Sequence, residues 1–214
     1  GEAAAVDFAS SLTRQQAMRT AAFYLIVFGF GFGVLSIGMM LVQTIPFMSD
    51  AGYSRTVASL MITVASIPAL ISKPIWGYFI DKTDAQKMSA LGFLLTAVAL
   101  VLIVFSVRSR IDPLVYFAFF LLGCGWGGLI PLQEVVWASF FGRRHLGAVR
   151  SAGLPFTLVL GASSPLLTSL YFDHVGNYDG AFLAVAGLGV LAVILTLSAR
   201  RPARVSVHVV DSSG

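Results

Sequence analysis

The sequence is poor in charged residues, cysteine and histidine. Only 11% of its 214 residues are Asp, Glu, Lys or Arg, against about 25% in soluble domains, so the chain is not an ordinary soluble domain. Its single cysteine, Cys124, excludes a disulfide framework within the chain and fits an inert packing role. The three histidines have no second ligand at metal-binding spacing on a shared helix face. We therefore expect no metal site and no other cofactor.

Long apolar runs fill most of the chain. Hydrophobic residues make up 57% of it, and six runs come close to the roughly 20 residues that cross a bilayer as a helix. The sequence predicts an all-α membrane protein with six transmembrane helices at about Ala21–Pro46, Thr56–Ile80, Met88–Val107, Pro113–Ser139, Ser151–Phe172 and Gly180–Ser198. Residues 21–199 form the predicted six-helix domain, between a linker and interfacial segment at 1–20 and a tail at 200–214.

The Lys and Arg residues are unevenly distributed between the two sides of the predicted membrane. Of the fourteen, ten fall on one side, three on the other, and Lys73 lies inside a span. The positive-inside rule then places both termini in the cytoplasm and explains the net charge of +4 without a nucleic-acid partner. The ten are Arg14, Arg19, Lys82, Lys87, Arg143, Arg144, Arg150, Arg200, Arg201 and Arg204, and the three are Arg55, Arg108 and Arg110.

The first twenty residues resemble a linker. The chain begins with Gly1, and its opening residues have neither the cations nor the cleavage site of a secretory signal. We expect this sequence to be part of a longer protein. Thr13 and Gln16 have the spacing of a capping box, which predicts a short interfacial helix before the first span.

A weak internal repeat relates the two halves of the domain. The second predicted helix ends in Tyr78–Asp81 and the fifth in Tyr171–Asp173, and the two aspartates are 92 positions apart. Three helices in each repeat would place the second copy upside down in the membrane. Such 3+3 inverted repeats are found in many secondary transporters.

Lys73 is the one cation inside an apolar run, where it is flanked by Pro68 and Pro74. It lies eight residues before Asp81, which corresponds to a depth of roughly 12 Å in a helix. A buried cation in hydrocarbon is costly unless it faces water or a partner. It either attracts an anionic substrate in a central cavity, or pairs with a fixed acid, or extends to the membrane surface.

Three other polar residues inside predicted spans are candidates for the same cavity. Glu134 is a proton-linked carboxylate, a partner of Lys73, or an interfacial acid near Arg143 or Arg144. Thr157 and Ser163 either line the cavity or satisfy backbone groups that nearby prolines leave free.

Two pairs of glycines are four residues apart, at Gly29 and Gly33 and at Gly123 and Gly127. Each pair predicts a closely packed helix face.

The loop after the second helix carries a recognisable pattern. Its residues Gly77-x-Phe79-x-Asp81-Lys82 resemble the G-x-L-x-D-R/K signature of the major facilitator superfamily. Asp84 stands where that signature prefers Gly, so the match is degenerate. The resemblance implies a gating loop built on Gly77, Asp81 and Lys82, and it implies that the chain is one six-helix half of a transporter whose N-terminal half is its partner.

A second motif, Phe140–Arg150, resembles the F-G-R-R-x-L-G loop of bacterial facilitators in the monocarboxylate and oxalate:formate antiporter branch. In that branch a cation before a proline contacts the substrate carboxylate, and Lys73-Pro74 matches it. The resemblance implies a multi-pass protein of the bacterial plasma membrane that transports a small organic anion, coupled to a proton or a counter-anion. Arg143 and Arg144 are gating residues or anchors at lipid headgroups.

The sequence also allows two alternatives to a half of a larger transporter. A six-helix unit can also act alone as a homodimer. Gly161–Ser164 resembles the serine motif of intramembrane proteases, but the next helix has no histidine to act as a base. The chain has no G-x-x-x-x-G-K-[ST] motif for ATP. We therefore expect a secondary transporter and no enzyme.

Overall fold

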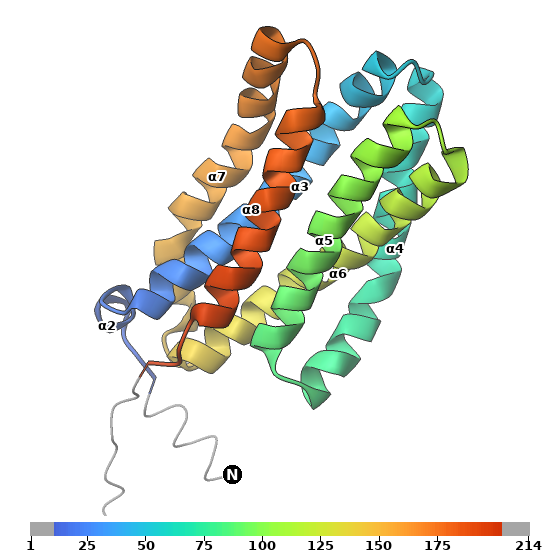
Figure 1. Ribbon diagram of the computed structural model, residues 1–214. Helices are drawn as coiled ribbons and strands as arrows, with labels where there is room; N and C mark the ends of the chain where they lie inside the picture. The colour runs from blue at the N-terminus through green and yellow to red at the C-terminus, as the bar shows by residue number, and fades with distance from the viewer. Residues whose placement is uncertain (1–10, 203–214) are drawn as a thin grey trace, which may run out of the picture.

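The computed structural model describes residues 11–202, and all regular structure in that range is helical (Figure 1). Six of the helices are long and apolar enough to cross a membrane, which confirms the predicted six spans. They extend up to five residues beyond the predicted ends, and α4 and α5 begin directly after the capping residues Ser54 and Asp84. The helices are α2 (Arg14–Met18), α3 (Ala21–Asp50), α4 (Arg55–Lys82), α5 (Ala85–Arg108), α6 (Asp112–Phe141), α7 (Leu146–Val175) and α8 (Asp179–Ser198).

The short helix α2 begins at the predicted capping box. Thr13 accepts a hydrogen bond from the Gln16 backbone, and the Gln16 side chain accepts one from the Thr13 backbone at 2.9 Å. The segment before α2 is fixed by a bond from the Leu12 amide to the Phe141 carbonyl at 2.9 Å. The start of the described chain is thereby tied to the end of α6.

The helix bounds reveal the internal repeat. Helices α3 and α6 both have 30 residues, and they begin 91 positions apart, at Ala21 and Asp112. Helices α4 and α7 also begin 91 positions apart, at Arg55 and Leu146. The chain runs in opposite directions through the two members of each pair (Figure 1). This is the predicted 3+3 inverted repeat, with a spacing one residue shorter than the two aspartates suggested.

The packing order follows from the repeat. Helix α4 packs along α6, while α3 packs along α7 in the other half, and α5 lies against both α6 and α8. Helices α4 and α7 therefore lie on opposite sides of the bundle (Figure 1). Their most apolar segments are only 28% and 22% buried, against 50% or more for α3, α5 and α6.

Small residues allow the closest helix contacts. A Cβ on Gly123 would clash with the backbone carbonyl oxygen of Ala65 on α4, and one on Gly127 would clash with Ser72. The predicted close packing at this glycine pair is thus confirmed. On α3, Gly29 faces Thr196 of α8 and Gly33 faces the ring of Phe93.

Candidate functional site

The exposed face of α4 is divided into a polar and an apolar part. Ser59, Thr63, Ser66 and Lys73 are all exposed and follow one another at intervals of four, three and seven residues. These intervals place them on one side of the helix. We call these four residues the polar stripe. Leu70, which is also exposed, interrupts the stripe between Ser66 and Lys73, and the rest of the exposed face carries large apolar side chains, Leu60, Ile67, Ile71, Ile75 and Phe79.

Lys73 is the last residue of the polar stripe along the chain and lies nearest to the C-terminal end of α4. Within residues 11–202, no ion pair joins it to an acid. The helix is held beside it by Trp76, whose indole Nε1 donates to the Cys124 carbonyl of α6 at 2.8 Å. Pro68 and Pro74 both lie inside the continuous helix α4. The backbone under Lys73 is therefore fixed, while its ammonium group faces away from the bundle.

Glu134 has a partner that the sequence did not suggest. Its carboxylate lies 2.5 Å from Nη1 of Arg150, which joins α6 to the first turns of α7. Both side chains are a little more than one-third exposed. The structure therefore assigns Glu134 to Arg150 and not to Lys73.

Thr157 and Ser163 both bond to their own helix. The Thr157 hydroxyl donates to the Leu154 carbonyl at 3.0 Å, and the Ser163 hydroxyl donates to the Leu160 carbonyl at 2.8 Å. Thr157 is buried, and it packs near Gly31 of α3. It thus belongs to the contact between α3 and α7, whereas Ser163 is partly exposed.

Two polar contacts between helices were missed by the sequence reasoning. Gln43 is buried on α3, and its amide nitrogen donates to Ser169 at 2.8 Å and to the Pro165 carbonyl at 3.0 Å. Trp126 on α6 donates from its indole to Ser36 on α3 at 3.2 Å. The signal for Gln43 was present, since an amide inside an apolar run needs a partner.

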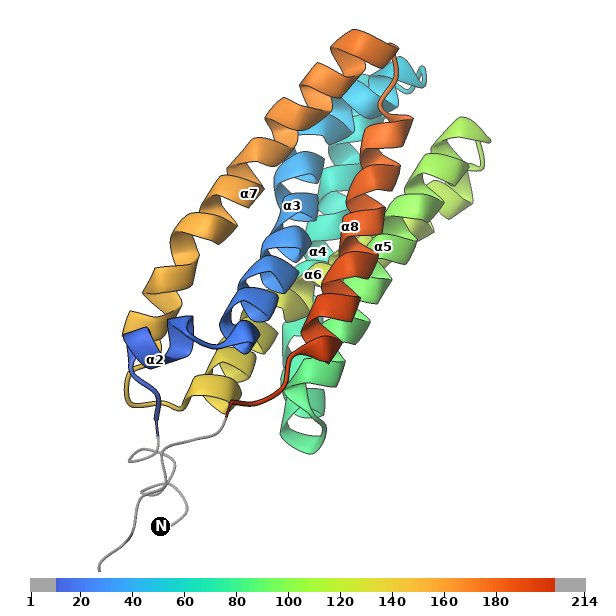
Figure 2. The same ribbon diagram turned by 60° about the vertical axis from the view of Figure 1, so that its left-hand side comes forward.

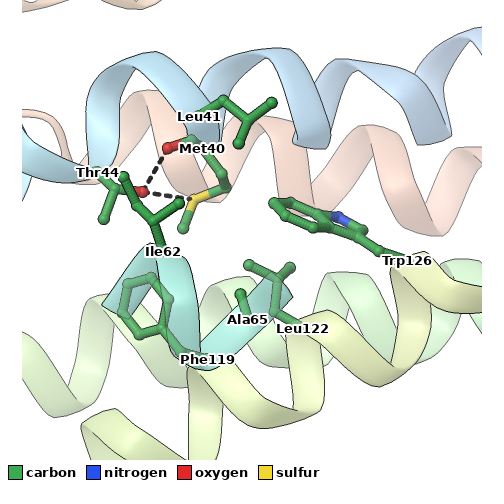
Figure 3. Close-up of a pocket in the computed structure, with 8 residues that line it drawn as sticks. All are labelled: Met40, Leu41, Thr44, Ile62, Ala65, Phe119, Leu122 and Trp126. Atoms are coloured by element: carbon green, nitrogen blue, oxygen red, sulfur yellow. Dashed lines mark hydrogen bonds between the residues drawn. The ribbon is translucent and has the colours of Figure 1, made fainter. Parts of the chain in front are cut away.

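Trp126 also closes one side of a small cavity between α3, α4 and α6 (Figure 3). The cavity has a volume of about 10 Å³, close to the minimum for one water molecule. Its Thr44 hydroxyl donates to the Met40 carbonyl at 2.5 Å and so offers no free donor. The other lining side chains are apolar, namely Met40, Leu41, Ile62, Ala65, Phe119, Leu122 and Trp126.

The loop between α4 and α5 contains two aspartates in different surroundings. Asp81 is exposed, whereas Asp84 caps α5 by accepting from the Gln86 amide at 2.8 Å. Asp84 is suited to this because it directly precedes the first turn. Lys82 lies 4.2 Å from the ring centre of Tyr78. Gly77 has open space where a Cβ would be.

The loop between α6 and α7 turns at Gly142, whose φ of 82° favours glycine. Arg143 and Arg144 follow and are exposed. The Arg144 amide donates to Ser11 at 3.2 Å, so the segment before α2 holds this loop in place. The two arginines lie at the same end of the bundle as Lys82 and the start of α3.

Comparisons with known proteins give one consistent result. The sequence model of the Major Facilitator Superfamily matches residues 21–211. An uncharacterized transporter of Escherichia coli (strain K12), YebQ, is 27% identical over 160 residues. That alignment covers 73% of this chain and 34% of the relative, so the chain spans about a third of the relative's length.

Proposed function

The chain belongs to the major facilitator superfamily, and on this premise we propose that it is the C-terminal six-helix half of a secondary transporter for a small organic anion. Transport would proceed by alternating access, in which two six-helix halves rock around a central site. The inverted repeat and the relative's description as a transporter support this assignment. The partially buried flanks α4 and α7 are suited to contact the other half.

The observation that carries the anion assignment is the position of Lys73. It lies nine residues before the end of α4, or about 13 Å along the helix axis. At that depth an ammonium group without an acidic partner is unfavourable in lipid. A position on a polar stripe, with Ser59, Thr63 and Ser66, supports a water-filled cavity that this stripe would line. A carboxylate such as that of a monocarboxylate would neutralise Lys73 there.

Several features support the remaining assignments. Glu134 is the only acid away from the helix ends in residues 11–202, and it would be the group through which a proton couples to transport. A counter-anion gradient is the other source of energy. The described cations gather at the end where α2 lies, which supports a cytoplasmic location for that end in the bacterial plasma membrane. Arg143, Arg144 and the Gly77–Lys82 loop would contact the other half there.

A homodimer of this unit is the second candidate. The apolar part of the α4 face, with Ile67, Ile71 and Ile75 each more than half exposed, could be covered by a second copy as well as by a different half. The mass of the purified protein in detergent distinguishes a dimer of this unit from a two-half chain. The serine motif does not favour hydrolysis, since Ser163 and Ser164 both donate to carbonyls of their own helix.

The test is uptake by the protein in liposomes, with labelled lactate and other small monocarboxylates as probes. Lys73→Gln is expected to raise the half-saturating concentration at least about tenfold, because a hydrogen bond to a charged group contributes about 1.5–3 kcal/mol. Lys73→Arg should retain most of the affinity. Lys87→Gln, a change of an exposed cation in the first turn of α5, is the matched control. Unchanged uptake by Lys73→Gln would contradict the anion assignment.

A further inference from the structure

An apolar groove of about 550 Å³ lies between the lower parts of α3 and α8. Figure 2 shows α3 between α7 and α8, which diverge toward the end at which α2 lies. The groove opens at the surface of the bundle, because its lining residues Tyr24, Phe28 and Leu191 are exposed. Its lining residues are Ala21, Tyr24, Leu25, Phe28, Phe32, Leu191 and Leu195.

Two arginines flank the end of this groove. Arg19 lies two residues before Ala21, and Arg200 lies five residues after Leu195. Both are exposed, and neither forms an ion pair with an acid in the described part of the chain. The helix ends that carry them border the same groove, since Ala21 of α3 and Leu195 of α8 both line it. The groove therefore ends between two cations at the level of the helix ends.

A second groove provides an internal comparison. It has a volume of about 360 Å³ and lies between α5 and α8, lined by residues such as Val98, Val101 and Leu183. The cation at its end of α5 is Arg108, which is already bound to Asp50 and Asp179. Of these two grooves, the one between α3 and α8 ends beside cations that form no ion pair with an acid within residues 11–202.

We propose that the groove between α3 and α8 binds an anionic phospholipid. One acyl chain lies along Phe28, Phe32 and Leu191, and Arg19 and Arg200 bind the headgroup phosphate. Basic pockets between helices at the cytoplasmic side of a membrane are suited to anionic headgroups. Tyr24 is 42% exposed at the same end, and tyrosine favours the boundary between acyl chains and headgroups. The site is separate from the proposed anion site at Lys73.

The test is native mass spectrometry of the protein released from detergent with added lipid. Phosphatidylglycerol and phosphatidylcholine with identical acyl chains are the two probes. We expect a preference for phosphatidylglycerol, and we expect Arg19→Gln with Arg200→Gln to weaken its binding. Each arginine lost should lower the affinity about fivefold, because a basic residue near an anionic surface contributes about 1 kcal/mol. The control pair is Lys82→Gln with Lys87→Gln, which removes equal charge at the same end.

Two more measurements separate the groove from its charged end. Leu195→Trp fills the groove and should reduce binding of both lipids, whereas Val101→Trp in the second groove should leave the preference intact. Glycerol 3-phosphate, which has the charged group without acyl chains, should compete poorly. The proposal is overturned if the two arginine changes act no more strongly than the control pair. It is also overturned if glycerol 3-phosphate competes as well as the lipid, or if a second copy of the chain occupies the groove.

Discussion

Arg108 and Asp179 form an ion pair at 2.8 Å that joins the last residue of α5 to the first residue of α8. The same guanidinium group lies 3.0 Å from Asp50 at the end of α3. One cation thus holds three helix ends together at the end of the bundle opposite α2 (Figure 1). In an inverted repeat, this contact connects α3 and α5 of the first unit with α8 of the second.

Replacing Arg108 by Gln should destabilise the bundle, because Asp50 and Asp179 would then face each other without a cation. Partly exposed ion pairs each contribute up to about 1 kcal/mol, so we expect a loss of about 1–2 kcal/mol in a thermal unfolding assay in detergent. Arg55→Gln is the control, since Arg55 is exposed at the same end and forms no ion pair within residues 11–202. Equal melting temperatures for the two variants would show that the three-way contact adds no stability.

Gly123→Ala should be more harmful than most glycine substitutions in this chain. The new methyl group would clash with the backbone carbonyl of Ala65. A backbone atom in a helix cannot change rotamer as a side chain can, so α4 and α6 must move apart. Overpacking of this kind costs about 1–3 kcal/mol. Gly187→Ala is the matched control, because no atom lies within 4 Å of its added Cβ, and alanine favours a helix by about 1 kcal/mol. Thermal unfolding of both variants should therefore shift in opposite directions.

These contacts show how far the sequence could predict the structure. The six spans and the capping box at Thr13 follow from local patterns, because each depends on residues within one or two helical turns. The spacing of Gly123 and Gly127 likewise predicts a closely packed helix face, but it does not predict that Ala65 of α4 packs there. The Arg108 clamp does not, since its partners are 58 and 71 positions away. Which loop acid meets which cation depends on how the helix ends are arranged.

The residues of the candidate site could also be predicted only in part. The position of Lys73 inside a span was predictable, because it is a single charged residue in an apolar run. The partner of Glu134 was not, because Glu134 and Arg150 meet across the turn between α6 and α7. That turn depends on Gly142 and on the contact with Ser11. The pattern of residues within one helix does not predict the direction that the next helix takes after a turn.

The pair of Glu134 and Arg150 should contribute little to stability. Both side chains are more than one-third exposed, so solvent screens their attraction, and a double-mutant cycle of Glu134→Gln and Arg150→Gln should give a coupling of about 0.2–1 kcal/mol. The cycle of Glu134→Gln with Arg143→Gln is the control and should give a smaller coupling. If Glu134 couples proton movement to transport, Glu134→Gln should also abolish acceleration of uptake by an inward proton gradient. If the Glu134→Gln variant retained that acceleration, Glu134 would have no role in proton coupling and would only form the ion pair with Arg150.

The two parts of the α4 face should differ in access to water. We expect single cysteines at Ser59 and Ser66 to react with a membrane-impermeant thiol reagent, because the polar stripe lines the proposed cavity. Cysteines at Ile67 and Ile71 should react slowly, since a lipid tail or the other half would cover the apolar part. The background is Cys124→Ala, which removes the single native thiol and keeps the backbone carbonyl to which Trp76 donates. Ser66 and Ile67 are adjacent in the sequence and therefore have similar depth, so a difference between these two positions cannot be attributed to depth alone. Equal labelling of both sets would mean that the stripe is not a boundary between water and lipid, and the reason for placing an anion at Lys73 would be lost.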